Sequence, residues 1–224
     1  GSLSEYWRAT RIWWDNIENK QPSLSEKPVY FVSSNPHSIA NLISGYALEN
    51  RDTLINFVNE KADPALKEEW DDLHKLENPS SIENFLYYVL KKYQQTPEGK
   101  ESIAQQIADE KAQGILRIPS QHSFDVEAQV IELNKLDPSR LDPRLLSGKG
   151  EGDFLSKSNA VILNIDYPLG LGAYNILTKL AEHLPDILGV YIMGKAATLN
   201  GVLGDVMIPN VVQDEHSQNT YLFQ

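Results

Sequence analysis

Apolar residues near the start of the chain recur first at helical spacing and then at strand spacing. From Leu3 to about Asn19 they recur every three or four residues, which predicts an amphipathic helix with an aromatic face packed in a core or an interface. Val29–Val32 is a short apolar run typical of a strand. The Ser33–Asn35 segment that follows holds turn and cap residues, and Pro36 suits the first position of a helix.

The middle of the chain has helical periodicity throughout. Between Glu49 and Gly114 apolar stripes recur at three- and four-residue spacing, and Ser80 and Glu83 have the spacing of a capping box. Fourteen acidic side chains stand against seven basic ones between Glu49 and Glu110, which favours a solvated acidic helix face over a metal site. We therefore expect a helical insertion over residues 49–114.

The last part of the chain alternates strands with a helix. Gly114–Pro119 has strand character. Residues 124–133 fit a strand or a helix, and the alternation of Val126, Ala128 and Val130 favours a strand. Ala160–Ile165 is a continuous apolar run of the kind buried on both faces of a parallel sheet. A glycine-containing turn, a helix and a second apolar run at Leu188–Met193 follow, which predicts a right-handed βαβ unit. A further strand is expected at Asp205–Val212.

Together these elements predict an α/β fold with a mostly parallel sheet and flanking helices. We expect an N-terminal helix and a first strand–turn–helix over residues 3–48, followed by the helical insertion. An α/β portion is expected over residues 115–224.

The composition restricts the class of protein. The chain has 224 residues, a net charge of −11 and no cysteine, which excludes disulfides and thiolate chemistry and argues against an extended nucleic-acid surface. No apolar run approaches the ~18 residues of a membrane span, and no signal peptide is visible, so we expect a cytoplasmic protein without a membrane partner. The initial Gly1-Ser2 has the form of a scar left by tag removal. No metal and no cofactor is expected.

Three turns are candidates for a ligand site, because open α/β sheets bind ligands beyond the carboxyl ends of their strands. They are Ser33–His37, Asp166–Gly172 and Gly194–Thr198. Gly170 and Gly172 permit close approach of the backbone, although glycines at a helix start are also common for packing. The sequence "GLGAYN" lacks the third glycine of a dinucleotide-binding fingerprint, and "GKAATLNG" lacks the hydroxyl residue of a phosphate-binding P-loop.

The order of these motifs matches a known family. A buried strand ends in the turn with Gly170 and Gly172, and its helix carries Asn175; a second strand precedes the small-residue loop Gly194–Thr198, and Gly204-Asp205 opens the next strand. In this order and spacing, residues 160–216 resemble the middle of the nucleoside phosphorylase family, which includes purine nucleoside and uridine phosphorylases and the related nucleosidases.

The resemblance implies a nucleoside site in which small side chains leave room for the base against the backbone. Its expected residues are Gly170, Gly172, Gly194, Lys195, Ala196 and Ala197. Lys195 departs from the family, which has a small residue there, and either contacts a ligand or points to solvent. The resemblance gives Asp205 a structural role in its loop.

The family's two phosphate-binding arginines have no counterparts. Asn35-Pro36 stands where the family has Asp-Pro, Ser38 stands in place of the first arginine, and the Asp166–Asn175 segment lacks the second. Without these two arginines the chain lacks the bidentate hydrogen bonds that hold phosphate. Their absence favours hydrolysis, or nucleoside binding without cleavage, over phosphorolysis. A weak anion site, with phosphate as a candidate ligand, is still expected at Ser33, Ser34, Asn35 and His37, although a capping or partly buried histidine is the simpler interpretation.

The family's ribose-holding glutamate and catalytic aspartate lie beyond the Gly-Asp strand, and the sequence ends at Gln224 before either, so no catalytic residue is assigned. We expect an inactive fragment of a longer protein that binds or cleaves the N-glycosidic bond of a nucleoside or nucleotide. The alternative is a non-catalytic interaction module whose acidic helices and Trp-rich first helix dock a protein partner. A homo-oligomer is compatible with both hypotheses.

Overall fold

The computed structural model describes residues 3–73, 75, 80–120, 125–146, 152–166, 168, 170–194, 199–202, 204–215 and 217–222. Contacts divide the chain into a first unit, Gly1–Met193, and a second unit, Gly194–Gln224. Each unit is described by itself below.

A five-stranded sheet forms the centre of the first unit, in the order β2-β3-β4-β1-β5. Strands β1, β4 and β5 pair in parallel, and β3 is antiparallel to both of its neighbours. Four of the five strands therefore run in one direction, which confirms the expected α/β fold. The strands are β1 Val29–Ser33, β2 Ile115–Ile118, β3 Ala128–Glu132, β4 Val161–Ile165 and β5 Ile187–Ile192.

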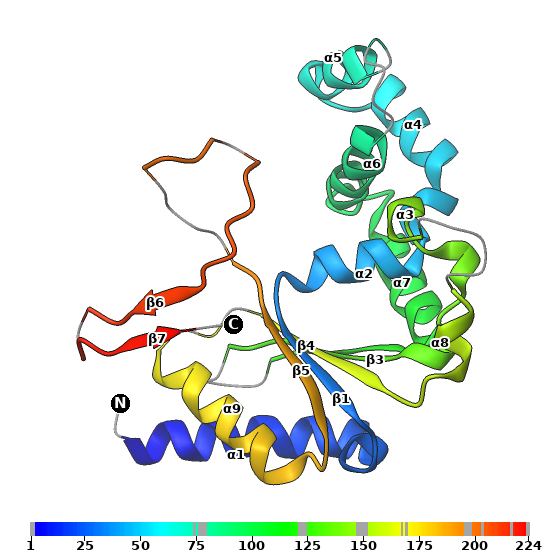
Figure 1. Cartoon of the computed structure of the whole chain (residues 1–224). Coiled ribbons are helices and arrows are strands. Elements are labelled where there is room, and N and C mark those ends of the chain that lie inside the picture. The colour runs from blue at the N-terminus through cyan, green and yellow to red at the C-terminus, as the bar shows by residue number, and fades with distance from the viewer. Residues whose placement is uncertain are drawn as a thin grey trace. The chain divides into compact units, whose positions relative to one another are not determined.

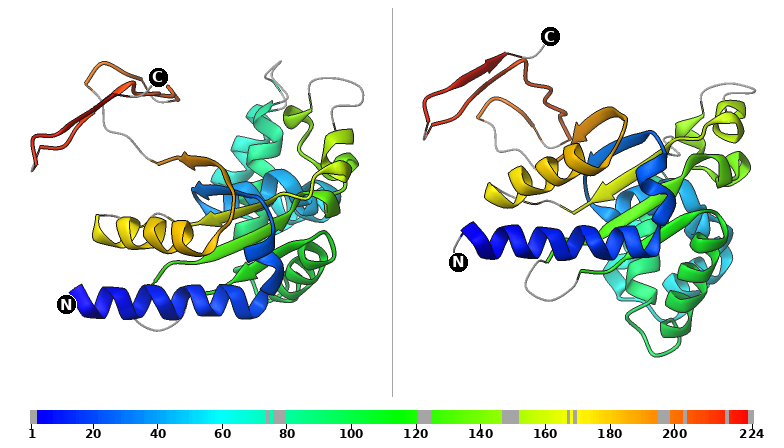
Figure 2. Two further views of the ribbon diagram at one scale, coloured as in Figure 1. Left: turned by 60° about the horizontal axis from the view of Figure 1, so that its bottom comes forward. Right: turned by 90° about the horizontal axis from the view of Figure 1, so that it is seen from below.

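Helices cover both faces of this sheet. Figure 1 shows α2 above the strands, with α1 and α9 below them, and both views of Figure 2 show α1 and α9 running side by side. The helices are α1 Leu3–Lys20, α2 Pro36–Ser44, α3 Tyr46–Glu49, α4 Arg51–Glu60, α5 Pro64–Leu73, α6 Ser80–Tyr93, α7 Lys100–Ala112, α8 Asp153–Lys157 and α9 Leu171–His183. Short 3₁₀ turns are η1 Pro22–Glu26, η2 Leu133–Lys135, η3 Pro138–Arg140 and η4 Pro143–Leu145.

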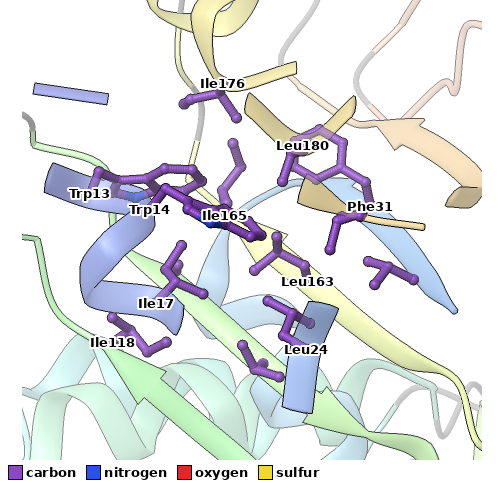
Figure 3. Close-up of a cluster of buried hydrophobic side chains, with 14 of the residues drawn as sticks. Trp13, Trp14, Ile17, Leu24, Phe31, Ile118, Leu163, Ile165, Ile176 and Leu180 are labelled. Atoms are coloured by element: carbon purple, nitrogen blue, oxygen red, sulfur yellow. The ribbon is translucent and has the colours of Figure 1, made fainter. Parts of the chain in front are cut away.

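The core beneath α1 and α9 is the largest apolar cluster of the sheet. Trp14 of α1 is 1% exposed, and Ile176 and Leu180 of α9 are fully buried. Figure 3 shows these side chains gathered over Leu163 and other residues of the strands. The Trp13–Ile17 part of the aromatic face expected for the first helix is therefore core packing, whereas Trp7 is 42% exposed. The apolar periodicity of this part explains why the segment folds as a helix against the sheet.

A second cluster fills the opposite face, where Ile43 of α2 and Leu155 of α8 pack near Tyr30 and Ile162. Because Tyr30 and Phe31 are successive strand residues, they face opposite sides of the sheet and enter different clusters. The acidic helical segment has its own core, in which Trp70 and Phe85 stack with ring centroids 5.4 Å apart.

Two expectations about the last strands are wrong. Residues Asp205–Val212 do not join the large sheet: the strand there is β6, Val211–Gln213, and it pairs only with β7, Thr220–Leu222, in a hairpin of the second unit. The run Leu188–Met193 does form β5, but it is an edge strand and Ile192 is 72% exposed. A continuous apolar run was expected to be buried, but an edge strand has a neighbour on one side only.

The strand–helix–strand unit also differs in detail from the expectation. Helix α9 connects β4 to the parallel strand β5, as the pattern indicates, but β1 lies between these two strands in the sheet. The insertion of β1 comes from a long-range pairing that no local pattern reveals.

Candidate functional site

The carboxyl ends of β1 and β4 lie side by side at a topological switch point. Ser33 pairs with Ile165 at the ends of the two strands, and the Ser34 backbone N–H donates to the Ile165 carbonyl at 2.9 Å. The chain then leaves β1 into α2 on one face of the sheet, and leaves β4 toward α9 on the other (Figure 1). Divergence of this kind opens the crevice in which open α/β sheets bind ligands.

A chain of buried hydrogen bonds fixes the floor of this crevice. Ser34 Oγ donates to Asn164 Oδ1 at 3.0 Å, and Asn164 Nδ2 donates to Gln129 Oε1 at 3.1 Å. Gln129 Nε2 completes the chain by donating to the Pro36 carbonyl at 3.1 Å. Three strands and the start of α2 are thereby tied together, and the bonds satisfy polar groups whose burial would otherwise be costly.

These bonds use several groups that were expected to bind an anion. Ser33 and Ser34 are both buried, and the Ser34 hydroxyl is bonded to Asn164. The Asn35 side chain caps α2 by accepting from the His37 backbone N–H at 2.9 Å. The capping function is the simpler of the two interpretations of this turn, and anion binding by these residues stays a prediction.

His37 is exposed at the start of α2, with charges of both signs nearby. Partial burial lowers the pKa of its imidazole from the ordinary value, and the nearby positive charges of Arg117 and Lys91 lower it further. The histidine is therefore predominantly neutral at pH 7. Arg117 is bound by the buried carboxylate of Glu110, with nitrogen–oxygen distances of 2.5 and 2.7 Å, so its charge is already paired.

The start of α9 forms the other wall of the crevice. Gly170 precedes the helix with φ 53°, a left-handed conformation that favours glycine. No side chain of the described residues caps this helix end. Among the described residues, a Cβ atom added at Gly170 would meet nothing within 4 Å, and one at Gly172 would meet only Pro168 Cβ at 3.9 Å. Room is therefore left beside the uncapped N–H groups.

Asn175 is the most informative side chain of this wall. It is 1% exposed on the buried face of α9, and its Nδ2 atom is buried without a hydrogen-bond partner. Side chains in a helix lean toward its N-terminus, so the amide group of Asn175 covers the turn that contains Gly172. Buried donors are nearly always paired, and this one has hydrogen-bonding capacity that the described residues do not use.

The third expected turn is only partly described. Gly194 is the first residue of the second unit, while Lys195, Ala196 and Ala197 lie outside the described residues. Within the second unit, Asp205 Oδ2 accepts from the Val202 N–H at 2.9 Å, as expected for a residue that holds its own turn. The structure thus brings together the Ser33–His37 and Asp166–Gly172 turns, and the nucleoside-facing role of the Gly194 loop stays a prediction.

Sequence reasoning missed the buried pair Asn164 and Gln129. Each is a polar residue inside an apolar strand, in "AVILNI" and "EAQVIE". A polar side chain in a run that is buried on both faces needs an internal partner, so this interruption was the available signal.

Comparison with known proteins yields a family but no activity. No helix among the described residues combines the length and the apolar character needed to cross a membrane. No curated protein and no solved structure matches the chain. A family model matches residues 1–224, and the chain accordingly belongs to the family of unknown function DUF6909.

Proposed function

We propose that this chain binds a nucleoside or a nucleotide-like small molecule in the crevice between the carboxyl ends of β1 and β4. The observation that carries the proposal is the buried Nδ2 donor of Asn175, which has no hydrogen-bond partner among the described residues. Asn175 lies near the start of α9, the helix that follows β4. An amide side chain can donate to a base or a sugar oxygen and accept from a ring or exocyclic N–H.

Further support comes from the surroundings of Asn175. The uncapped start of α9 presents backbone N–H groups, and Gly170 and Gly172 leave space for a planar group to approach the backbone. The resemblance of residues 160–216 to nucleoside phosphorylases adds the expected class of ligand. The separate β6–β7 hairpin is a departure from that resemblance, because the family continues its sheet at this point.

Binding without phosphorolysis is the mode that we propose. Arg117, a basic residue close to His37, is paired with Glu110, and the two phosphate arginines of the family have no counterparts here. We therefore expect the purified chain to release no free base from inosine, adenosine or uridine, with or without phosphate. Chromatographic detection of a free base would contradict this expectation.

A substitution at Asn175 tests the site. Titration calorimetry with adenosine, inosine and uridine should detect binding by the unmodified chain, and Asn175→Leu should weaken the affinity on the order of tenfold or more. The melting temperature of Asn175→Leu should stay equal or rise, because the change removes a buried donor that no protein group satisfies. Thr178→Leu, less than one turn further along α9, is the matched control and should retain affinity.

Two results would overturn the proposal. One is that none of the three nucleosides binds to the unmodified chain. The other is that the unmodified chain and Asn175→Leu bind a nucleoside with equal affinity. A collapsed melting transition in Asn175→Leu would assign the amide to packing instead of recognition.

Docking of a protein partner through the first helix has less support. Trp13 and Trp14, two of the four tryptophans in the chain, are 4% and 1% exposed and lie in the core of the sheet. Of the aromatic residues on this helix, Tyr6 and Trp7 are more than two-fifths exposed. The acidic helices therefore remain the main basis of the alternative.

A further inference from the structure

An apolar cavity lies on the α2 face of the sheet, well away from the β1–β4 crevice. Its volume is about 750 Å³, and its floor consists of Tyr30 and Ile162, which pair across β1 and β4. Tyr30 and Ser34 are four residues apart on one strand, roughly 13 Å along its axis. The cavity is therefore a different feature from the candidate nucleoside site.

The walls of the cavity come from three segments of the first unit. Ile43 of α2 forms one side, leucines of the 133–146 segment form another, and Leu155 and Phe154 of α8 close the third. Among the described residues, every lining side chain is apolar except Tyr30 and Ser158, and none carries a charge. A volume of this size suits a ligand of ordinary small-molecule dimensions.

The mouth of the cavity exposes apolar surface that a soluble domain normally covers. Phe154 is 62% exposed and Leu145 is 46% exposed, although both line the cavity. Exposed apolar groups that border an apolar hollow mark a binding site more often than isolated surface residues do. The site is thus accessible from solvent in the described structure.

The lining also defines the chemistry of the occupant. A charged head group inside the cavity would be buried without a counter-ion, which is costly, and the net charge of −11 further disfavours an anionic amphiphile. Tyr30 and Ser158 are the lining residues that carry hydroxyl groups. Ser158 Oγ accepts from the Ala160 N–H at 3.2 Å and keeps its own proton to donate.

We infer that this cavity is a binding site for an uncharged, largely apolar small molecule, of the size of a medium-length alkyl chain with one hydroxyl or carbonyl group. The alkyl portion lies against the leucines and Ile162, and the polar group meets the hydroxyl of Tyr30 or Ser158. Neither the family nor the proposed nucleoside site assigns a ligand to this place.

The test uses N-phenyl-1-naphthylamine, an uncharged probe whose fluorescence rises in apolar sites, and 1-decanol as the competitor. The purified chain should bind the probe saturably, and 1-decanol should displace it. Ser158→Trp fills the cavity from a half-buried position and should weaken probe affinity on the order of tenfold or more. Ser156→Trp is the matched control: Ser156 lies in α8, of which Ser158 is the C-cap, and Ser156 is exposed and does not line the cavity, so the probe affinity of this variant should be unchanged.

A second pair of variants keeps the test valid if Ser158→Trp fails to fold. Leu145→Asp places a charge at the exposed mouth of the cavity and should weaken the affinity for the probe. Leu177 is similarly exposed on α9, across the sheet, and Leu177→Asp should leave the affinity for the probe unchanged. Loss of probe binding in Ser158→Trp or Leu145→Asp with an unchanged melting temperature supports the site. The inference would be overturned if the probe did not bind saturably, or if both members of each pair bound it with equal affinity. It would also be overturned if the chain bound to phosphatidylcholine vesicles and did not bind 1-decanol.

Discussion

At the scale of single residues, the buried carboxylate of Asp142 shows how polar groups connect the helical segment to the sheet. Its side chain is fully buried, and it accepts hydrogen bonds from Tyr87 Oη at 2.5 Å and from Arg144 Nη2 at 2.7 Å. Burial alone would raise the pKa of this carboxyl, but the hydrogen bonds from Arg144 and Tyr87 outweigh burial and lower the pKa to about 2. Burial and the contact with Asp142 raise the pKa of Tyr87, and they outweigh the opposing effect of Arg144.

The lowered pKa predicts a pH dependence of stability. Because the folded pKa of Asp142 lies below the ordinary value of 3.8, its contribution is fully present above about pH 4 and is lost as the pH falls toward 2. Asp142→Asn should lower the free energy of unfolding at pH 7 by about 2 kcal/mol. In urea titrations from pH 5 to pH 2, the difference between the two proteins should shrink steadily.

Asp137 provides the matched control for this prediction. It caps the neighbouring 3₁₀ turn in the same way, accepting from the Ser139 N–H at 2.9 Å, but it is exposed. Asp137→Asn should therefore change stability much less than Asp142→Asn does. A difference at Asp142 that does not vary with pH would contradict the ionic explanation.

At the scale of elements, the junction between α2 and α3 depends on one glycine. Gly45 has φ 68°, and a Cβ atom there would lie 2.5 Å from the Arg140 carbonyl oxygen. The left-handed conformation and this close approach together require glycine, whereas Gly170, also at positive φ, has open space around it among the described residues.

The two glycines give a paired prediction. Gly45→Ala should lower the free energy of unfolding by more than about 2 kcal/mol, and Gly170→Ala by only about 1 kcal/mol, because only the first adds a steric clash to the cost of positive φ. Chemical denaturation of both variants measures the difference. Equal losses would show that the contact with Arg140 does not constrain the junction.

Local patterns were enough to predict most elements of the sheet. The apolar runs gave β1, β4 and β5, and the periodicity near Trp14 gave α1, because a segment that buries one face must repeat at the period of its structure. The edge position of β5 could not be predicted, since strand order arises from long-range pairing. The prediction that Asp205–Val212 joins the large sheet was wrong for a similar reason: a run of strand-forming residues does not specify the strand with which it pairs.

The candidate site was predictable only in part. The turns at Ser33–His37 and Asp166–Gly172 follow strands, so their position at one edge of a parallel sheet could be inferred. The unpaired amide of Asn175 could not, because burial and hydrogen bonding of a side chain depend on the packing of α9 against the sheet.

At the scale of the whole molecule, the first unit carries two candidate ligand regions on one sheet. The region that we propose at the carboxyl ends of β1 and β4 holds polar groups, among them the buried Asn164 and Asn175, whereas the cavity lined by α8 is apolar. Both regions use β1 and β4, which pair along their full length and hold the two regions at a fixed separation. Stability of this strand pair is therefore a common requirement of both proposals.

The measurement that tests the central claim most directly is a nuclear magnetic resonance titration of the ¹⁵N-labelled chain with adenosine, inosine and uridine. The side-chain NH₂ signal of Asn175 is assigned by its absence in Asn175→Leu. The account predicts that this signal shifts saturably with at least one nucleoside, together with backbone amides at the start of α9, because the buried donor gains its missing partner. An Asn175 signal that stays in place while the nucleosides reach millimolar concentration, or shifts confined to other parts of the chain, would contradict it.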